Sequence, residues 1–210
     1  MELSHIRKDF GLHRLIESEM PGDPISFLKT WLKEVSLKEV PDFNAMVLST
    51  VGKNNKPSSR IVLLKEITEK GQLVFFTNYD SRKGNEISGN KQVALNFFWP
   101  VMERQVRVEG TVSKVSREQS KAYFDSRPLE SRISAILSPQ SKEIESLDEF
   151  RSKAKEMLQI QRDLKIPENW GGYSVSPEFY EFWQGGRDRL HDRITYTLKN
   201  SDWKMARLAP

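Results

Sequence analysis

FNAMVLSTV at residues 43–51 opens the stretch that decides the fold. Four more runs of the same kind follow it: SRIVLLKEI (59–67), LVFFTN (73–78), VALNFFWP (93–100) and RQVRVEGTVSKV (104–115). Each run is short and rich in Val, Ile, Leu and Phe, and turn signals such as GKNNKP (52–57) and EKG (69–71) separate them. Five such runs in succession predict an antiparallel sheet or barrel.

Helical patterns flank these strands. Asp23 and Pro24 form an N-cap and first-turn pair before five apolar residues at helical spacing: Phe27, Leu28, Trp31, Leu32 and Val35. Helical spacing returns in REQSKAYFDS (117–126), LESRISAIL (129–137) and LDEFRSKAKEMLQIQRDL (147–164), and strands return in YSVSP (173–177), FYEFW (179–183), RLHDRITYTL (189–198) and DWKMARL (202–208). The pattern predicts an α+β fold, a small antiparallel barrel with flanking helices.

Composition narrows the class of protein. The 210 residues, 37% of them hydrophobic, suit a single domain over 1–210, and the absence of cysteine excludes disulfides, thiolate metal sites and a cysteine nucleophile. The N-terminus lacks a signal-peptide pattern and no stretch has the length of a membrane span, so we expect a cytoplasmic protein without a membrane partner. The net charge of +4 suits a phosphorylated small ligand as well as a nucleic acid.

Ser81, Arg82 and Lys83 begin a short helical segment. Two cations in a first helical turn oppose the helix dipole, and a bound anion would resolve that conflict. The alternative, that both side chains bend into water, is equally compatible with this segment.

Two further segments combine cations with polar groups. In KAYFDSRPLESRI (121–133), Tyr123, Arg127 and Ser131 recur every fourth residue, and Pro128 puts Arg127 at a junction between two helices, where free amides suit an anion. An ordinary pair of exposed helices is the alternative. In GGRDRLHDRITY (185–196), strand alternation puts four residues on one face: Arg187, Arg189, His191 and Arg193. A planar anionic ligand would suit them, although the residues alone slightly favour a solvated edge strand.

The strand predicted around residues 60–65 alternates as well. Arg60, Val62 and Leu64 face one side, and Ile61, Leu63 and Lys65 face the other. Its two terminal cations could contact two ligand groups or simply be solvated. Gln105 could offer a donor and an acceptor to a heterocycle.

These segments, in this order, resemble the pyridoxine 5'-phosphate oxidase family. The resemblance runs from about Arg7 to Pro210 and is carried by RIVLLK, FFTN with SRKG, ERQVRVEG, YFDSRP, SPQS, EFWQGGRDRLHDR and RLAP. It implies a split β-barrel homodimer with flavin mononucleotide (FMN) at the subunit interface. It also implies a mobile N-terminal segment over 1–22 and dimerisation and substrate strands over 170–210.

The resemblance also implies site residues. It places FMN against Arg60, Ile61, Val62, Leu63, Leu64, Lys65, Phe76, Thr77, Arg82, Lys83, Gln105, Gln140, Ser141, Trp183 and Arg193. It places substrate against Arg7, Phe10, Lys65, Tyr123, Arg127, Ser131, Arg189, Leu190 and His191, with Arg189 and His191 beside the reacting ring. The family commonly has tyrosine where this chain has Phe10, so a hydroxyl contact is lost there.

The implied activity is FMN-dependent oxidation of pyridoxine 5'-phosphate or pyridoxamine 5'-phosphate to pyridoxal 5'-phosphate. Dioxygen is the acceptor and hydrogen peroxide the second product, and no nucleic acid takes part. One alternative is a split-barrel flavin or deazaflavin reductase with another substrate, which leaves Tyr123, Arg127 and Ser131 unexplained. Another is a non-catalytic flavin or pyridoxal phosphate carrier, and a third is a basic nucleic-acid module whose affinity would fall steeply with salt.

Overall fold

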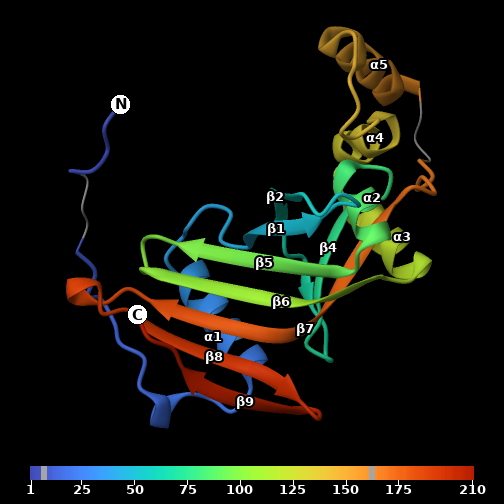
Figure 1. Ribbon diagram of the computed structural model, residues 1–210. Coiled ribbons are helices and arrows are strands. Elements are labelled where there is room, and N and C mark those ends of the chain that lie inside the picture. Colours follow the sequence, from blue (N-terminus) through green and yellow to red (C-terminus); the bar gives the residue numbers. More distant parts are fainter. Residues whose placement is uncertain (6–8, 161–163) are drawn as a thin grey trace.

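One nine-stranded sheet organises the part of the chain that the computed structural model describes, residues 1–5, 9–160 and 164–210 (Figure 1). The strand order is β2-β1-β5-β6-β7-β4-β3, and β8 and β9 extend the sheet from β7. The strands are β1 (Ala45–Val51), β2 (Pro57–Leu63), β3 (Glu66–Ile67), β4 (Leu73–Asn78), β5 (Gln92–Trp99), β6 (Arg104–Lys114), β7 (Trp170–Gln184), β8 (Asp192–Lys199) and β9 (Asp202–Arg207). Every pairing is antiparallel, which confirms the predicted α+β barrel-type fold.

The helices occupy two regions. They are α1 (Pro24–Ser36), α2 (Arg82–Gly89), α3 (Arg117–Ser126), α4 (Leu129–Leu137) and α5 (Leu147–Ile160), with short 3-10 turns η1 (Glu17–Glu19) and η2 (Arg187–Arg189). Figure 1 shows α2 to α5 gathered at the end of the sheet where β7 begins, with α1 against the sheet itself. Among the described residues, no helix is both long and apolar enough to cross a bilayer.

β7 is the longest strand and the one on which the sheet divides. It pairs with β6 along nearly its full length, while its other edge pairs first with β4 (170–175) and then with β8 (179–184). We predicted two separate strands here, over 173–177 and 179–183, and Pro177 lies where they meet. The structure keeps one strand because Pro177 lies opposite a register shift between Glu109 and Gly110, where a proline costs little. A Cβ on Gly110 would lie 2.2 Å from the Ser176 carbonyl oxygen, so the close approach of β6 and β7 at this register shift requires glycine.

Helix α1 covers one face of this sheet, as its pattern predicts. The Asp23 carboxylate accepts from the amides of Ile25 (3.1 Å) and Ser26 (2.9 Å) and so caps the helix. The Phe27 ring packs 4.4 Å from that of Phe182 on β7, and Leu28 is fully buried. The helix is therefore held by the apolar stripe that the spacing indicated.

Two predicted strands end earlier or begin later than expected. The strand over 59–67 stops at Leu63, because the next residues change partners: the Leu64 amide donates to Asn44 (2.9 Å) and the Lys65 amide to Val74 (2.8 Å). The strand over 189–198 begins only at Asp192, since Gln184 pairs with Asp192 and the seven residues between them form the connecting loop.

The packing of α1 gives a stability prediction. Leu28→Ala should lower the free energy of unfolding by about 2–5 kcal/mol, because it removes a fully buried side chain from between helix and sheet. Lys29→Ala, on the exposed side of the same turn, should stay within about 0.5 kcal/mol. Urea unfolding at one fixed protein concentration measures both, and equal losses would contradict this packing.

Candidate active site

A cavity of about 460 Å³ lies between β2, β4, the start of α2 and the junction of α3 with α4. It brings together eleven of the residues expected in the site: Ile61, Val62, Leu63, Lys65, Phe76, Thr77, Lys83, Tyr123, Arg127, Ser131 and Gln140. Pro128 and Trp170 complete the lining. Residues from four separate segments thus converge as the resemblance implied.

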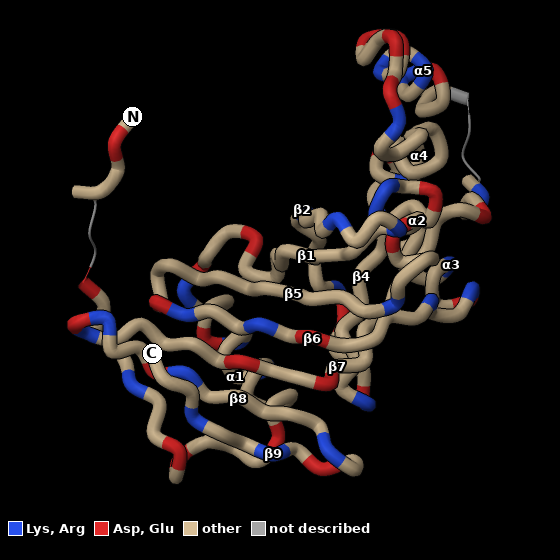
Figure 2. The backbone as a smooth tube through the Cα atoms, viewed as in Figure 1, with Lys and Arg blue, Asp and Glu red and all other residues tan. Residues whose placement is uncertain are grey.

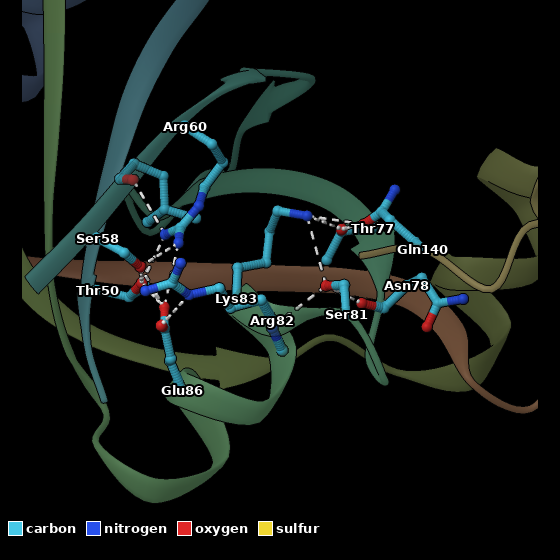
Figure 3. Close-up of polar contacts among 12 residues, drawn as sticks. Thr50, Ser58, Arg60, Thr77, Asn78, Ser81, Arg82, Lys83, Glu86 and Gln140 are labelled. Carbon is cyan, nitrogen blue, oxygen red and sulfur yellow. Dashed lines mark hydrogen bonds and ion pairs between the residues drawn. The ribbon is translucent and has the colours of Figure 1, made fainter. Parts of the chain in front are cut away.

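Lys83 occupies one end of this cavity and is buried (Figure 3). Its Nζ donates to Gln140 Oε1 (2.7 Å) and Thr77 Oγ1 (3.2 Å), and Ser81 caps α2 beneath it through the Gly84 amide. Burial, and then the charge of Arg60, lower the pKa of Lys83 to about 8. No carboxylate within the described residues lies in ion-pair distance of this ammonium. The positive charge of Lys83 is therefore available to bind an anion at this end of the cavity.

Arg127 supplies a second cation, at the helix junction that the sequence predicted. It caps α3, and Pro128 precedes α4. Its guanidinium lies 4.9 Å from the Trp170 ring centre, and its Nη1 is buried without a hydrogen-bond partner. Burial lowers the pKa of Arg127, but a guanidinium stays charged at neutral pH. A half-buried cation with a buried, unused donor fits an anionic ligand.

Aromatic rings form the wall next to Arg127. The rings of Phe76 and Tyr123 stack at 3.9 Å, and that of Tyr123 is nearly parallel to Trp170 at 6.2 Å. Lys65 Nζ lies 6.0 Å from the Tyr123 ring centre. Trp170 was not among the expected site residues, since on the sequence alone it appears only as the start of a strand.

Arg60 and Arg82 meet a residue that sequence reasoning missed. Arg82 begins α2 as expected, yet its Nε donates to Glu86 Oε1 (2.9 Å), and Arg60 Nη2 lies 3.1 Å from Glu86 Oε2 (Figure 3). The spacing of Arg82 and Glu86, four residues apart on one helix, was the available signal. Figure 2 shows basic and acidic positions interspersed along the described chain, so the positive charge of the cavity is local.

A second group of expected residues lies elsewhere, at the far end of β7. Gln105, Trp183 and Arg193 are cross-strand neighbours on β6, β7 and β8. The Phe10 ring lies 5.7 Å from both Trp183 and His191. The Gly186 amide donates to His191 Nδ1 (3.1 Å), so the neutral ring carries its hydrogen on Nε2.

Arg193 is held in place within this second group. Its Nε donates to Glu181 Oε1 (2.8 Å) and its Nη1 to the Ala209 carbonyl (3.0 Å). The hydrogen bond to buried Glu181 raises the pKa of Arg193 above its usual value. The C-terminal residues thus pack against a predicted ligand-binding side chain.

One expectation about this group is wrong. Arg187, Arg189, His191 and Arg193 do not share a strand face, because Arg187–Arg189 is a 3-10 turn and only Arg193 lies in β8. Asp188 (φ 53°) and Arg189 (φ 63°) adopt left-handed conformations that a strand does not contain.

Besides Arg60 and Arg82, four expected residues belong neither to the cavity lining nor to this second group. Leu190 is exposed in the loop, Leu64 is buried in the core, and Ser141 is exposed next to Gln140. Arg7 lies outside the described residues.

Within one chain the two groups do not meet. Trp170 lines the cavity, whereas Trp183 lies thirteen residues further along β7. At about 3.3 Å per residue, that separation is roughly 40 Å along the strand. One protomer therefore holds two parts of the expected site, one at the start of β7 and one at its end.

Two family models together match most of the chain. Residues 32–161 match the family model of pyridoxamine 5'-phosphate oxidase, and residues 170–210 match the pyridoxine 5'-phosphate oxidase C-terminal dimerisation region. The chain belongs to the pyridoxamine 5'-phosphate oxidase family. The match to the dimerisation region supports a homodimer, as in the interpretation of residues 170–210.

Relatives of known name cover the whole chain. It is 49% identical over 210 residues to the pyridoxine/pyridoxamine 5'-phosphate oxidase of Legionella pneumophila (strain Paris), which covers 99% of this chain and 97% of the relative. It is 47% identical over 212 residues to that of Herminiimonas arsenicoxydans, covering all of both. The crystal structure of PhzG from Burkholderia lata 383 in complex with tetrahydrophenazine-1-carboxylic acid has a TM-score of 0.88 at 27% identity, over 93% of this chain and 98% of that one.

Lys83 gives a pH prediction, with FMN as the expected ligand. Below pH 8 Lys83 is already charged, whereas above it the lysine must take up a proton as an anion binds. FMN affinity should therefore fall as pH rises through about 8, by up to tenfold per pH unit, while the ligand phosphate, with a second pKa of about 6, stays dianionic. Flavin fluorescence titration of the apoprotein measures this. Lys83→Met should bind FMN more weakly and without this pH dependence, and an equal slope in both proteins would contradict the assignment.

Proposed function

We propose that this protein oxidises pyridoxine 5'-phosphate and pyridoxamine 5'-phosphate to pyridoxal 5'-phosphate, with FMN as cofactor and dioxygen as acceptor. One observation carries the proposal: a single cavity is lined by two cations, the buried Lys83 and the half-buried Arg127, each lacking a carboxylate partner among the described residues. Two such cations suit two phosphorylated ligands, one cofactor and one substrate. Family membership over nearly the whole chain supports the same activity.

The residues present fit FMN at the Lys83 end of the cavity. Lys83, with Thr77 and Gln140 around its ammonium, would hold the phosphate at the start of α2, where helix amides also favour an anion. Exposed apolar side chains from β2, Ile61 and Leu63, would contact the flavin. When bound, FMN supplies the two-electron acceptor that no protein side chain provides.

The Arg127 end fits the substrate phosphate. Arg127 presents its unused Nη1, and Tyr123, Ser131 and Lys65 line the same side of the cavity. Held by its phosphate, the substrate ring would be fixed in one orientation, and this positioning is the main contribution of the protein to the rate. His191, with its hydrogen on Nε2, would donate to a ring oxygen, and Arg189 would stabilise electron-rich forms of the ring.

Since one chain separates the two groups, we propose that each active site combines the cavity of one protomer with Gln105, Trp183, Arg189, His191 and Arg193 of the other. The sheet face opposite α1 supports this arrangement. On it, Ile61 pairs with Val47, which pairs with Asn96, so Ile61 and Phe98 face the same way. Ile61 is 70% and Phe98 56% exposed, which suits a surface that a second copy covers.

The activity itself is directly testable. The FMN-loaded protein, incubated in air with pyridoxine 5'-phosphate, should produce aldehyde and hydrogen peroxide in equal amounts, measured by absorbance and a coupled peroxidase assay. Pyridoxine without its phosphate is the matched control, and it should react far more slowly because the Arg127 end has no anion to hold. A flavin-loaded protein that produced neither product would favour another substrate.

Subunit complementation tests the shared site. Arg127→Ala and Arg189→Ala should each impair turnover, because each removes a different half of every site. Co-expressed, about half of the dimers should be mixed and carry one complete site of two, restoring about a quarter of wild-type activity. Each variant co-expressed with itself is the control, and no recovery in isolated mixed dimers would place both residues in sites built by one chain.

A further inference from the structure

We infer that Glu86 is a positioning residue for the phosphate end of the cofactor site, acting mainly through Arg82. The inference rests on the proposed binding of FMN at the start of α2. Glu86 was not among the residues expected to contact a ligand, and it does not line the cavity. Its role follows from the hydrogen bonds and ion pairs that its carboxylate makes.

The Glu86 carboxylate joins three elements of the fold (Figure 3). Its Oε2 accepts from Thr50 Oγ1 on β1 and from Ser58 Oγ on β2, both at 2.6 Å, and pairs with Arg60 Nη2 at 3.1 Å. Its Oε1 accepts from Arg82 Nε at 2.9 Å, one turn earlier on α2. Both carboxylate oxygens are thus fully engaged.

The charge of Glu86 is fixed by the same contacts. Its side chain is only 10% exposed, and this burial opposes ionisation. The hydrogen bonds from Ser58, Thr50, Arg82 and Arg60 outweigh burial and lower the pKa of Glu86 to about 2. Glu86 is therefore an anion at any pH at which the protein would work.

The two arginines depend on Glu86 to different degrees. Arg60 has other acceptors, namely the Leu48 carbonyl (3.2 Å) and the hydroxyls of Thr50 and Ser58 (both 2.5 Å). Arg82 has Glu86 as its single side-chain partner among the described residues. The Arg82 side chain is also 64% exposed. Without Glu86, Arg60 would stay in place, whereas Arg82 would sample many rotamers.

Holding Arg82 by Nε leaves both of its Nη groups for a phosphate bound at the start of α2. Arg60 and Arg82 pair with the Glu86 carboxylate, and together with Lys83 these four side chains carry a net charge of +2, which matches a phosphate dianion. The orientation of Arg82 and the negative charge of Glu86 predict opposite effects of losing Glu86 on phosphate binding. If orientation dominates, losing Glu86 weakens phosphate binding; if repulsion of the phosphate by the carboxylate dominates, it strengthens binding.

The experiment is a double-mutant cycle on FMN affinity, measured by flavin fluorescence titration of the apoprotein. Glu86→Ala should weaken FMN binding roughly tenfold, because an unordered arginine must be immobilised when the ligand binds. Glu86→Gln keeps an oxygen acceptor for Arg82 and should stay within about threefold of wild type. Glu156→Ala, an exposed glutamate on α5, is the matched control and should bind FMN as wild type does.

The cycle distinguishes positioning from a general structural role. In the Arg82→Ala background, Glu86→Ala should cost no more than about threefold, because the residue through which it acts is already gone. Equal losses in both backgrounds, unchanged affinity, or tighter FMN binding in Glu86→Ala would each overturn the inference. A wild-type protein that fails to bind FMN would instead overturn the proposed function, and this inference with it.

Discussion

The pairing of β7 is the constraint on which the rest of the structure depends. One edge of this strand is bonded to β6 along nearly its whole length, and its other edge is divided between β4 and β8. Its first residue, Trp170, forms a wall of the cavity, and Trp183 near its end adjoins Gln105 and Arg193. One continuous strand therefore positions both groups of site residues and keeps them apart.

Most of the fold follows from local patterns in the sequence. Asp23 and Pro24 fix the start of α1, and the alternating runs between residues 43 and 115 become β1 to β6 within a few residues. The errors arise where distant pairing overrides a local pattern. Alternating charges over 187–193 resemble a strand, but the register of β7 with β8 makes most of them a loop. Pro177 resembles a strand end, but a bulge in β7, opposite Glu109 and Gly110 of β6, accommodates it.

The residues that line the cavity were predictable, but the arrangement of the expected site residues was not. Family resemblance supplied the cavity residues, and the helix junction at Arg127 followed from Pro128 alone. Glu86 was missed because an acidic residue in a polar helix resembles a solvated one until β1 and β2 are known to cover it. The separation of the cavity from His191 was also unpredictable, since it depends on the length of β7 rather than on any motif.

That separation limits how the proposed activity can arise. The loop between β7 and β8 has seven residues, and its ends are tied by the pairing of Gln184 with Asp192. Seven extended residues span at most about 25 Å, and a tethered loop reaches about half of that, against roughly 40 Å along β7. A rearrangement of this loop alone would not bring Arg189 or His191 to Trp170 and Arg127, on the β7-start side of the same chain's cavity. If both groups act on one substrate, a second copy must supply one of them, and turnover then requires the dimer.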